Sequence, residues 1–323
     1  YRIGLCPTPM LYFASNFYKA DGAIQVTGSH NPKDYNGFKI VLNQNSFFGE
    51  DIKKLGQFSS KGYSKTYDGF SKSVEVNNHY INEIIKPFKN IKRQFFEKTI
   101  VWDCGNGASG PSVETMTKKI PGNHIVLYSD VDGNFPNHHP DPTDESTLKI
   151  LLKKMNEVDA ELGIAFDGDG DRIGVVDKQG RSVAGDLLTA FLANSITRND
   201  KENQTIILDI KSSYIAYESI ISLGFKAEIG KTGHSNIKKR IKEIKSPLAG
   251  EVSGHIFFGD IYFGYDDALY ASIRLLSLMA NNFELDKFVS TLPKTFISSE
   301  IKVFCSDKIK FLTINNISKN VFE

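Results

Sequence analysis

The clearest chemical signal in the sequence is the aspartate-rich stretch DGDGDR at residues 167–172. Apolar runs at 162–166 and 173–176 flank this stretch and predict a tight loop between two strands. Three carboxylates at alternate positions repel one another unless a cation neutralises them. Because three protein ligands leave room for a phosphate oxygen and water, the arrangement suits Mg²⁺. We predict one magnesium ion, bound by Asp167, Asp169 and Asp171; a solvated acidic turn is the alternative.

A calcium EF-hand loop is the obvious competitor for this stretch. An EF-hand requires glycine at its sixth position and glutamate at its twelfth. Here these positions hold Arg172 and Lys178, so the EF-hand interpretation is excluded.

The second candidate is the serine of TGSHNP at residues 27–32, which follows a strand predicted at 23–26. Pro32 restricts the residue before it to an extended or turn conformation, so Ser29 is expected on a stiff bend. A serine hydroxyl is a weak nucleophile unless a base or metal activates it. Residue 27 is threonine, so the GxSxG elbow of hydrolases is absent. Taken alone, Ser29 is a turn residue; beside the acidic loop, it is predicted to transfer phosphoryl groups.

The third candidate is GEVSGH at residues 250–255, between two apolar stretches. Glu251 and Ser253 have the acceptor and donor groups that orient a small ligand such as a sugar. A solvated turn is the alternative for this motif alone. A phosphosugar site also needs cations for the phosphate and a proton donor or acceptor near the hydroxyls. Candidates near predicted strand ends are Lys39, Lys211, Lys231 and His234.

The elements that must position these residues alternate between strands and helices, which indicates α/β layers. The strands are predicted at 23–26, 37–42, 99–103, 161–166, 173–176 and 205–210, and the helices at 79–88, 148–155 and 187–196. Residues 47–73 are rich in Ser, Lys, Gly and Tyr and are expected to be exposed. The polar stretch 198–203 is predicted to be a domain boundary.

Composition excludes several classes of protein. The 323 residues are 40% hydrophobic and 24% charged, as in soluble globular proteins. The net charge of +1 gives no general attraction to nucleic acid or an anionic membrane. Three cysteines without a CxxC pair argue against a disulfide framework or structural zinc and favour a reducing cytoplasm. Because residue 1 is Tyr rather than Met, we expect sequence to be missing upstream.

Taken together and in this order, TGSHNP, DGDGDR and GEVSGH resemble the α-D-phosphohexomutase superfamily, especially bacterial phosphomannomutase/phosphoglucomutase. The resemblance extends along the whole chain through DCGNG at 103–107, KTGHS at 231–235 and FGYDD at 263–267. It implies four α/β domains around a central cleft, of which the first three are related. The domains would be 1–92 (N-terminally incomplete), 93–200, 201–297 and 298–323, the last being only the start of an α+β phosphate-binding domain.

The resemblance implies a role for each candidate residue. Ser29 would carry the transferred phosphoryl group and complete the Mg²⁺ shell, and a hexose 1,6-bisphosphate would be the intermediate and activator. Lys39, His234 and His255 would be catalytic acid/base groups. The residues that contact substrate would be Arg172, Lys211, Lys231, Glu251, Ser253 and His255.

The resemblance also implies a reaction, the reversible transfer of phosphate between the 1- and 6-positions of mannose or glucose. Val252 stands where glucose/mannose enzymes carry Met and phosphoglucosamine mutases carry Gln; being apolar, it favours glucose or mannose. Phosphoglucosamine mutase, a phosphosugar phosphatase and a non-catalytic phosphosugar-binding remnant are the alternatives. The expected partner is a phosphosugar, with no nucleic acid or membrane, and the expected state is a monomer or weak dimer.

Two segments typical of the family lie outside the sequence. The family has an arginine-bearing segment upstream and a phosphate-binding loop in its fourth domain. We therefore expect the chain by itself to show weak mutase turnover or none.

Overall fold

A computed structural model describes most of the chain, in two compact units, Tyr1–Thr291 and Leu292–Glu323. The described residues are 1–32, 34–62, 68–88, 97–197, 200–294, 303–306 and 308–322. The predicted boundaries after residues 92 and 297, and residues 198–199 of the predicted polar boundary, lie outside them. The second unit contains α11 (Lys310–Phe322). None of the helices among the described residues is both long and apolar enough to cross a bilayer.

The first part of the larger unit is a three-stranded antiparallel sheet in the order β1-β2-β3. Its elements are α1 (Thr8–Phe17), β1 (Gly22–Val26), β2 (Phe38–Leu42), β3 (Asn45–Phe47) and α2 (Glu50–Ser60). In helix α1 all residues from Thr8 to Ser15 are buried, and the helix packs against β1. Helix α2 has no buried residue. The strands predicted at 23–26 and 37–42 are confirmed, and the described residues of 47–73 are mostly exposed, as predicted. Helix α1 was not predicted.

The second part is a five-stranded mixed sheet in the order β5-β4-β6-β7-β8. Its elements are α3 (Asn77–Ile84), η1 (Lys86–Phe88), β4 (Thr99–Asp103), α4 (Gly110–Thr117), β5 (Asn123–Leu127), α5 (Lys149–Glu157), β6 (Leu162–Phe166), β7 (Ile173–Val176) and β8 (Ser182–Val183). Strands β5, β4 and β6 are parallel, and β7 and β8 are antiparallel to their neighbours. All side chains of β6 and β7 are buried, which explains their continuous apolar sequence. The acidic loop therefore joins two buried strands.

The third part is a four-stranded sheet in the order β10-β9-β11-β12. Its elements are α6 (Gly185–Leu192), η3 (Ala193–Ser195), η4 (Lys201–Asn203), β9 (Thr205–Asp209), α7 (Tyr214–Ser222), β10 (Lys226–Gly230), α8 (His234–Ile244), β11 (Leu248–Gly250), β12 (Ile256–Phe258), α9 (Ala268–Ala280) and α10 (Leu285–Thr291). Strands β10, β9 and β11 are parallel. The loops that follow these three strands therefore gather at one edge of the sheet.

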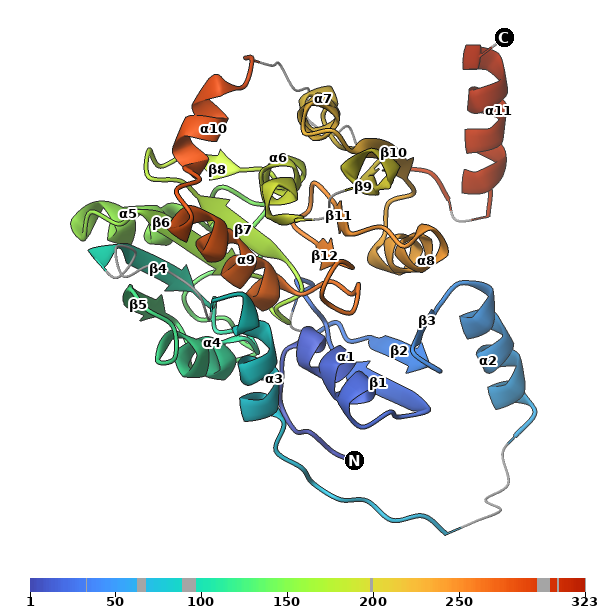
Figure 1. The fold of residues 1–323 in the computed structure, drawn as a ribbon. Helices are drawn as coiled ribbons and strands as arrows, with labels where there is room; N and C mark the ends of the chain where they lie inside the picture. The colour runs from blue at the N-terminus through green and yellow to red at the C-terminus, as the bar shows by residue number, and fades with distance from the viewer. Residues whose placement is uncertain are drawn as a thin grey trace. The chain divides into compact units, whose positions relative to one another are not determined.

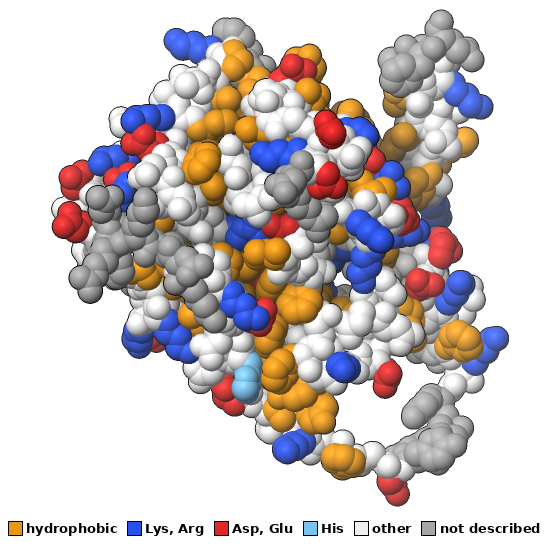
Figure 2. All heavy atoms as spheres, in the orientation of Figure 1, with side chains coloured by type: hydrophobic (Ala, Val, Ile, Leu, Met, Phe, Trp, Pro, Cys, Tyr) orange, Lys and Arg blue, Asp and Glu red, His pale blue; other side chains and the backbone are white. Residues whose placement is uncertain are grey.

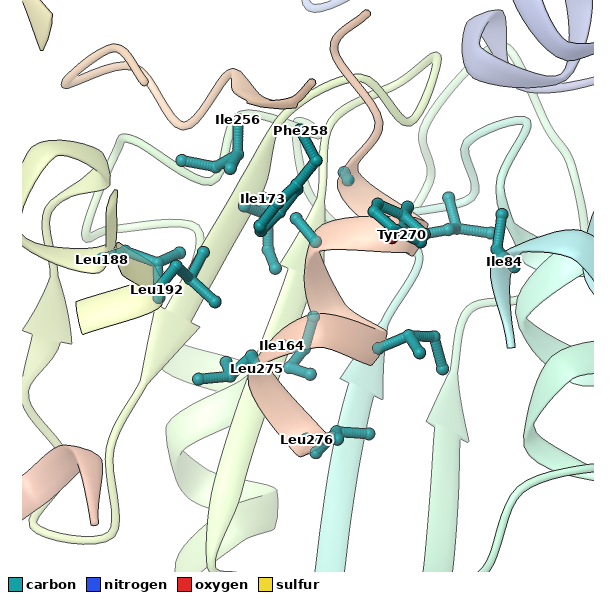
Figure 3. Packing of buried hydrophobic residues seen from close by; sticks show 14 of the residues in the cluster. Ile84, Ile164, Ile173, Leu188, Leu192, Ile256, Phe258, Tyr270, Leu275 and Leu276 are labelled. Atoms are coloured by element: carbon teal, nitrogen blue, oxygen red, sulfur yellow. The ribbon is translucent and has the colours of Figure 1, made fainter. Parts of the chain in front are cut away.

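The hydrophobic core joins the second and third parts around α9, which is buried along most of its length. Figure 3 shows Leu275 and Leu276 of α9 beside Ile164 of β6, with Ile173 of β7 and Phe258 of β12 close by. Phe258 meets Tyr270 edge to face, with ring centroids 5.4 Å apart. Figure 1 shows α9 lying over the five-stranded sheet, in front of β6 and β7. The core thus fixes the strand ends from which the candidate site is built, and the three α/β parts match the predicted fold class.

Candidate active site

Ser29 lies on the bend that follows β1 and has an unusual backbone conformation. Its φ of 51° is in the left-handed region, which non-glycine residues seldom adopt. The Ser29 N–H donates to Thr27 Oγ1 at 2.8 Å, which holds the bend. The hydroxyl donates to Asp167 Oδ2 at 2.9 Å, and its oxygen is 3.2 Å from His30 Nδ1. The bend therefore presents a serine oxygen directly to the acidic loop.

The acidic loop is held against the serine bend by its own backbone. Asp167 Oδ1 accepts from the N–H groups of Asp171 and Arg172, both at 3.1 Å, so its other oxygen is turned toward Ser29. Gly168 is in such close contact that a Cβ there would lie 2.3 Å from the Ser29 carbonyl oxygen. Only glycine allows the two backbones to approach this closely.

Asp169 accepts hydrogen bonds from side chains in three segments of the first part of the chain. Its Oδ2 accepts from Thr8 Oγ1 at 2.8 Å, Thr27 Oγ1 at 2.9 Å and Lys39 Nζ at 2.7 Å. Lys39 also pairs with Asp171. Burial raises the pKa of Asp169, but Lys39 and the hydroxyl donors outweigh it and leave that pKa below its ordinary range. Burial lowers the pKa of Lys39, but the two aspartates raise it well above its ordinary value, so the ammonium stays charged.

The acidic loop retains unneutralised carboxylates after these pairings. Burial and the neighbouring carboxylates raise the pKa of Asp167 well above its ordinary value, and Asp171 is shifted in the same direction by the same causes. The Oδ1 atoms of Asp169 and Asp171 are buried without a hydrogen-bond partner. One oxygen from each of the three aspartates can be chosen so that all lie within 4.8 Å of one another. Orphaned oxygens at this spacing fit a hard divalent cation with oxygen ligands.

Arg172 connects the acidic loop to the predicted sugar loop. Its Nε donates to His255 Nε2 at 3.1 Å, and its Nη2 is 3.4 Å from His30 Nε2. The backbones also pair, because Ile173 N donates to the carbonyl of Gly254 at 3.0 Å. A Cβ on Gly254 would lie 2.3 Å from the Ile173 carbonyl oxygen, so glycine is required here too.

The remaining predicted residues lie at the carboxyl edge of the third sheet. Lys211, Lys231 and Glu251 follow β9, β10 and β11 respectively, the three parallel strands. Both lysines are exposed. Glu251 is buried; it accepts from the Gly233 N–H at 2.7 Å and from Ser253 Oγ at 3.2 Å. Because Glu251 bonds to Gly233 and Ser253 and not to the lysines, both lysines are available to an anion. They lie at the edge where α/β sheets bind ligands.

His234 begins α8 and stacks on His255, with ring centroids 5.6 Å apart and an interplanar angle of 22°. Its Nδ1 is 2.9 Å from Lys238 Nζ, so the ammonium donates to it. Burial lowers the pKa of His234, and the Lys238 charge lowers it further, to about 3. His234 is therefore neutral near pH 7, and its Nε2 carries the proton.

Several site residues were not predicted. Thr8 and Thr27 bind Asp169, and the buried pair of Lys238 and Asp266 supports His234 and His255. Tyr12 accepts from Lys238 Nζ at 3.0 Å. The available signal was the i, i+4 spacing of His234 and Lys238 beside buried Ile237 and Ile241, which places both on the inner side of α8.

Two cavities lie near this network in the described part of the chain. A cavity of about 200 Å³ is lined by Ser29 and Asp169 together with Leu5, Tyr35 and Phe135. A cavity of about 650 Å³ lies between the β3–α2 segment and α8 and reaches Lys238. Glu251 lines neither of these two cavities. The Arg172–His255 contact connects the acidic loop beside Ser29 to the sugar loop. On the face shown in Figure 2, acidic and basic side chains are mixed.

Three family models match the chain. Their descriptions are "Phosphoglucomutase/phosphomannomutase, alpha/beta/alpha domain I", II and III, and they match residues 1–62, 78–180 and 184–296 respectively. A phosphomannomutase/phosphoglucomutase of Pseudomonas aeruginosa is 37% identical over 98% of this chain and 68% of its own length. A phosphoglucomutase of Neisseria meningitidis is 37% identical over 94% of this chain and 65% of its own length.

Solved structures show the same architecture. A phosphoglucomutase/phosphomannomutase family protein from Burkholderia thailandensis has a TM-score of 0.84 at 37% identity, covering 91% of this chain and 65% of its own. An N-acetylphosphoglucosamine mutase of Aspergillus fumigatus, in complex with GlcNAc-6P and magnesium, has a TM-score of 0.60 at 13% identity, covering 88% and 77%. The second likeness concerns the fold alone. The chain spans about two thirds of the Pseudomonas, Neisseria and Burkholderia proteins.

Proposed function

Because the chain belongs to the phosphoglucomutase/phosphomannomutase family of enzymes, we propose that it carries the phosphoryl-transfer site of a phosphohexomutase. The reaction is the interconversion of the 1- and 6-phosphates of mannose or glucose. The names of the Pseudomonas and Neisseria relatives support this substrate class. We propose this turnover for the whole protein and not for these 323 residues alone.

In the proposed reaction, the phosphoryl group passes from Ser29 to the sugar and back. The free hydroxyl of a hexose 1-phosphate attacks phosphoserine, which breaks the bond from phosphorus to Ser29 Oγ and gives a hexose 1,6-bisphosphate. After the bisphosphate turns over in the site, Ser29 Oγ attacks the other phosphate and releases the hexose 6-phosphate. The attacking hydroxyl loses one proton and the leaving oxygen gains one in each half, so the protein must hold protons near Ser29.

The observation that carries the proposal is the 2.9 Å contact between Ser29 Oγ and Asp167 Oδ2, which joins residues 138 positions apart. Asp167, Asp169 and Asp171 would hold Mg²⁺ together with an oxygen of the phosphoserine. Bound there, Mg²⁺ would supply the positive charge that stabilises the moving phosphoryl group. The buried orphan oxygens support this assignment, since a buried carboxylate oxygen without a partner is costly.

Lys39 and Arg172 are assigned complementary tasks. Lys39 stays charged beside Asp169 and Asp171, so its proposed task is to balance the negative charge that develops at the leaving serine oxygen; an acid role for it would require these two ion pairs to loosen. Arg172 lies between His30 and His255 and is placed to hold an equatorial phosphate oxygen. His234, being neutral, would donate a hydrogen bond through Nε2 rather than act as an acid.

Sugar and distal phosphate are assigned to the third sheet. Glu251 and Ser253 would bind neighbouring hydroxyls, and Lys211 and Lys231 the phosphate that does not react. His255 accepts from Arg172 Nε at its Nε2, so the acid/base role predicted for it from the sequence would require that contact to break.

A mutase assay on the whole protein tests the proposal. Glucose 1-phosphate, mannose 1-phosphate and glucosamine 1-phosphate are compared with Mg²⁺ and a catalytic amount of glucose 1,6-bisphosphate. Turnover of glucose and mannose substrates supports the proposal, and preference for glucosamine 1-phosphate changes the substrate. Release of inorganic phosphate alone indicates a phosphatase, and no turnover with intact binding indicates a non-catalytic protein.

A further inference from the structure

Asp266 is a fully buried carboxylate between β12 and α9 that contacts three basic side chains. Its Oδ1 accepts from Lys238 Nζ at 2.8 Å. Its Oδ2 lies 3.1 Å from His255 Nδ1 and 3.6 Å from His234 Nδ1. Burial raises the pKa of Asp266, but the Lys238 charge and His255 outweigh it and hold that pKa well below its ordinary value. Paired with Lys238, Asp266 places a carboxylate directly behind the histidine pair.

The contacts of His255 determine which of its nitrogens carries the proton. Arg172 Nε–H donates to His255 Nε2 at 3.1 Å, so Nε2 must offer its lone pair. In a neutral imidazole the other nitrogen then bears the hydrogen. That nitrogen, Nδ1, lies 3.1 Å from Asp266 Oδ2 and 3.7 Å from Asp171 Oδ1, and neither Nδ1 nor Asp266 Oδ2 has an aligned hydrogen bond to a described group. A carboxylate at this position selects the Nδ1–H tautomer.

We propose that Asp266 is a positioning residue for phosphoryl transfer, which fixes the tautomer of His255 so that His255 aims Arg172 at the serine bend. From Arg172, Nη2 lies 3.4 Å from His30 Nε2, and His30 Nδ1 lies 3.2 Å from Ser29 Oγ. The contacts thus run without a gap from the third sheet to the nucleophile. The proposal rests on the proposed function, because it gives Arg172 a phosphate to hold.

Two other interpretations of Asp266 are available. Asp171, His255 and Asp266 have ligand atoms within 4.8 Å of one another, which is a spacing that a metal ion could bridge. A protonated Nδ1 cannot be a metal ligand, however, and Lys238 already neutralises Asp266. Alternatively, Asp266 only anchors α8 through Lys238. That structural role predicts a loss of stability without a change in the His255 tautomer.

The first experiment compares two neighbouring substitutions in the whole protein. Asp266→Asn keeps the size of the side chain, but with its oxygen on Lys238 it turns an NH₂ toward His255 Nδ1, and we expect the proton to move to Nε2. We expect kcat to fall on the order of 10²- to 10⁴-fold, as when a buried aspartate that orients a catalytic imidazole is neutralised, with KM within about threefold. Asp267→Asn is the matched control, because Asp267 is equally buried but binds Tyr80, Tyr262 and the start of α9.

The second experiment reads the tautomer directly from the ¹⁵N NMR shifts of histidine-labelled protein, with the His255 signal assigned by its loss in His255→Gln. We expect Nδ1–H in the wild type and in Asp267→Asn, and Nε2–H in Asp266→Asn. A wild-type Nε2–H tautomer overturns the proposal even if Asp266→Asn does not fold. Equal kcat in the two variants also overturns it. If the wild type has no mutase turnover, the proposed function fails, whereas the NMR result still decides whether Asp266 sets the tautomer.

Discussion

Lys39 and the pair of Lys211 and Lys231 all supply positive charge to the candidate site, but they differ in how they are held. Lys39 is half-buried, with 16% of its side chain exposed, and pairs with Asp169 and Asp171. Lys211 and Lys231 are exposed and make no hydrogen bond or ion pair to any described residue. A charge already fixed by the protein acts best on the transition state, whereas free charges act on the bound ground state as well. Changes near Ser29 should therefore lower kcat, and changes at the third sheet should raise KM.

The largest effect is expected for Ser29→Ala. Removing the hydroxyl removes the atom to which phosphate is transferred, so turnover should fall to background while the fold is kept. The mutase assay and circular dichroism of the whole protein measure the two quantities. Residual turnover above background would mean that another group carries the phosphate. The contrast between the Ser29 region and the third sheet would then have no basis.

Metal binding should be the next largest contribution. Asp169→Asn removes one proposed ligand and a partner of Lys39, and we expect kcat to fall on the order of 10³-fold, because several kcal/mol of charge stabilisation go with the metal. Chelation of Mg²⁺ by EDTA should produce a comparable loss in the wild type, reversed when Mg²⁺ is restored. Activity that survives both treatments would contradict the assignment of the aspartates.

A smaller effect is expected where the acidic loop contacts the Ser29 bend. In Gly168→Ala the added methyl group would meet the Ser29 carbonyl at 2.3 Å and displace the bend. A misplacement of about 1 Å costs roughly 10²-fold in rate, so kcat should fall by about this factor. Gly56→Ala in α2 is the control, because a Cβ there meets nothing within 4 Å. If both variants match the wild type, the close approach of the loops has no catalytic value.

The third-sheet edge should respond through KM. Lys211→Ala is expected to raise KM about tenfold with kcat little changed, since a charge-assisted hydrogen bond to phosphate contributes about 1.5 kcal/mol. Lys226→Ala is the control, because Lys226 begins β10 and lies at the opposite edge of the same sheet. A fall in kcat with constant KM would show that Lys211, like Lys39, acts on the transition state.

The last effect concerns stability and leaves catalysis unchanged. Asp267 is a buried carboxylate that pairs with no cation among the described residues, and burial raises its pKa from 3.8 to about 6. Between these values the folded state binds more protons than the unfolded state, so this contribution to stability is full below pH 3.8 and is lost as pH rises through 6. The loss is about 3 kcal/mol. The Tm of Asp267→Asn relative to the wild type should therefore increase from pH 4 to pH 8, and a constant difference would contradict this.

Sequence patterns predicted the main strands and the three loops, because buried strands and glycine-rich turns leave local signals. They also singled out Ser29 and the aspartates, whose chemistry is visible in adjacent residues. They did not reveal Thr8, which meets Asp169 across 161 positions, because a single threonine has no local signal for such a contact. Lys238 was hidden for another reason. It belongs to a lysine-rich helix, and only the packing of α8 shows that it is 6% exposed and paired with Asp266.

The most direct test of the account is the site of phosphate in the whole protein after incubation with glucose 1,6-bisphosphate, determined by peptide mass spectrometry with and without Mg²⁺. If Ser29 and the three aspartates share one divalent ion, a single phosphoryl group should appear on Ser29, should require Mg²⁺ and should be absent from Asp169→Asn. Phosphate on another residue, or labelling of Ser29 that is indifferent to Mg²⁺ and to Asp169, would contradict it.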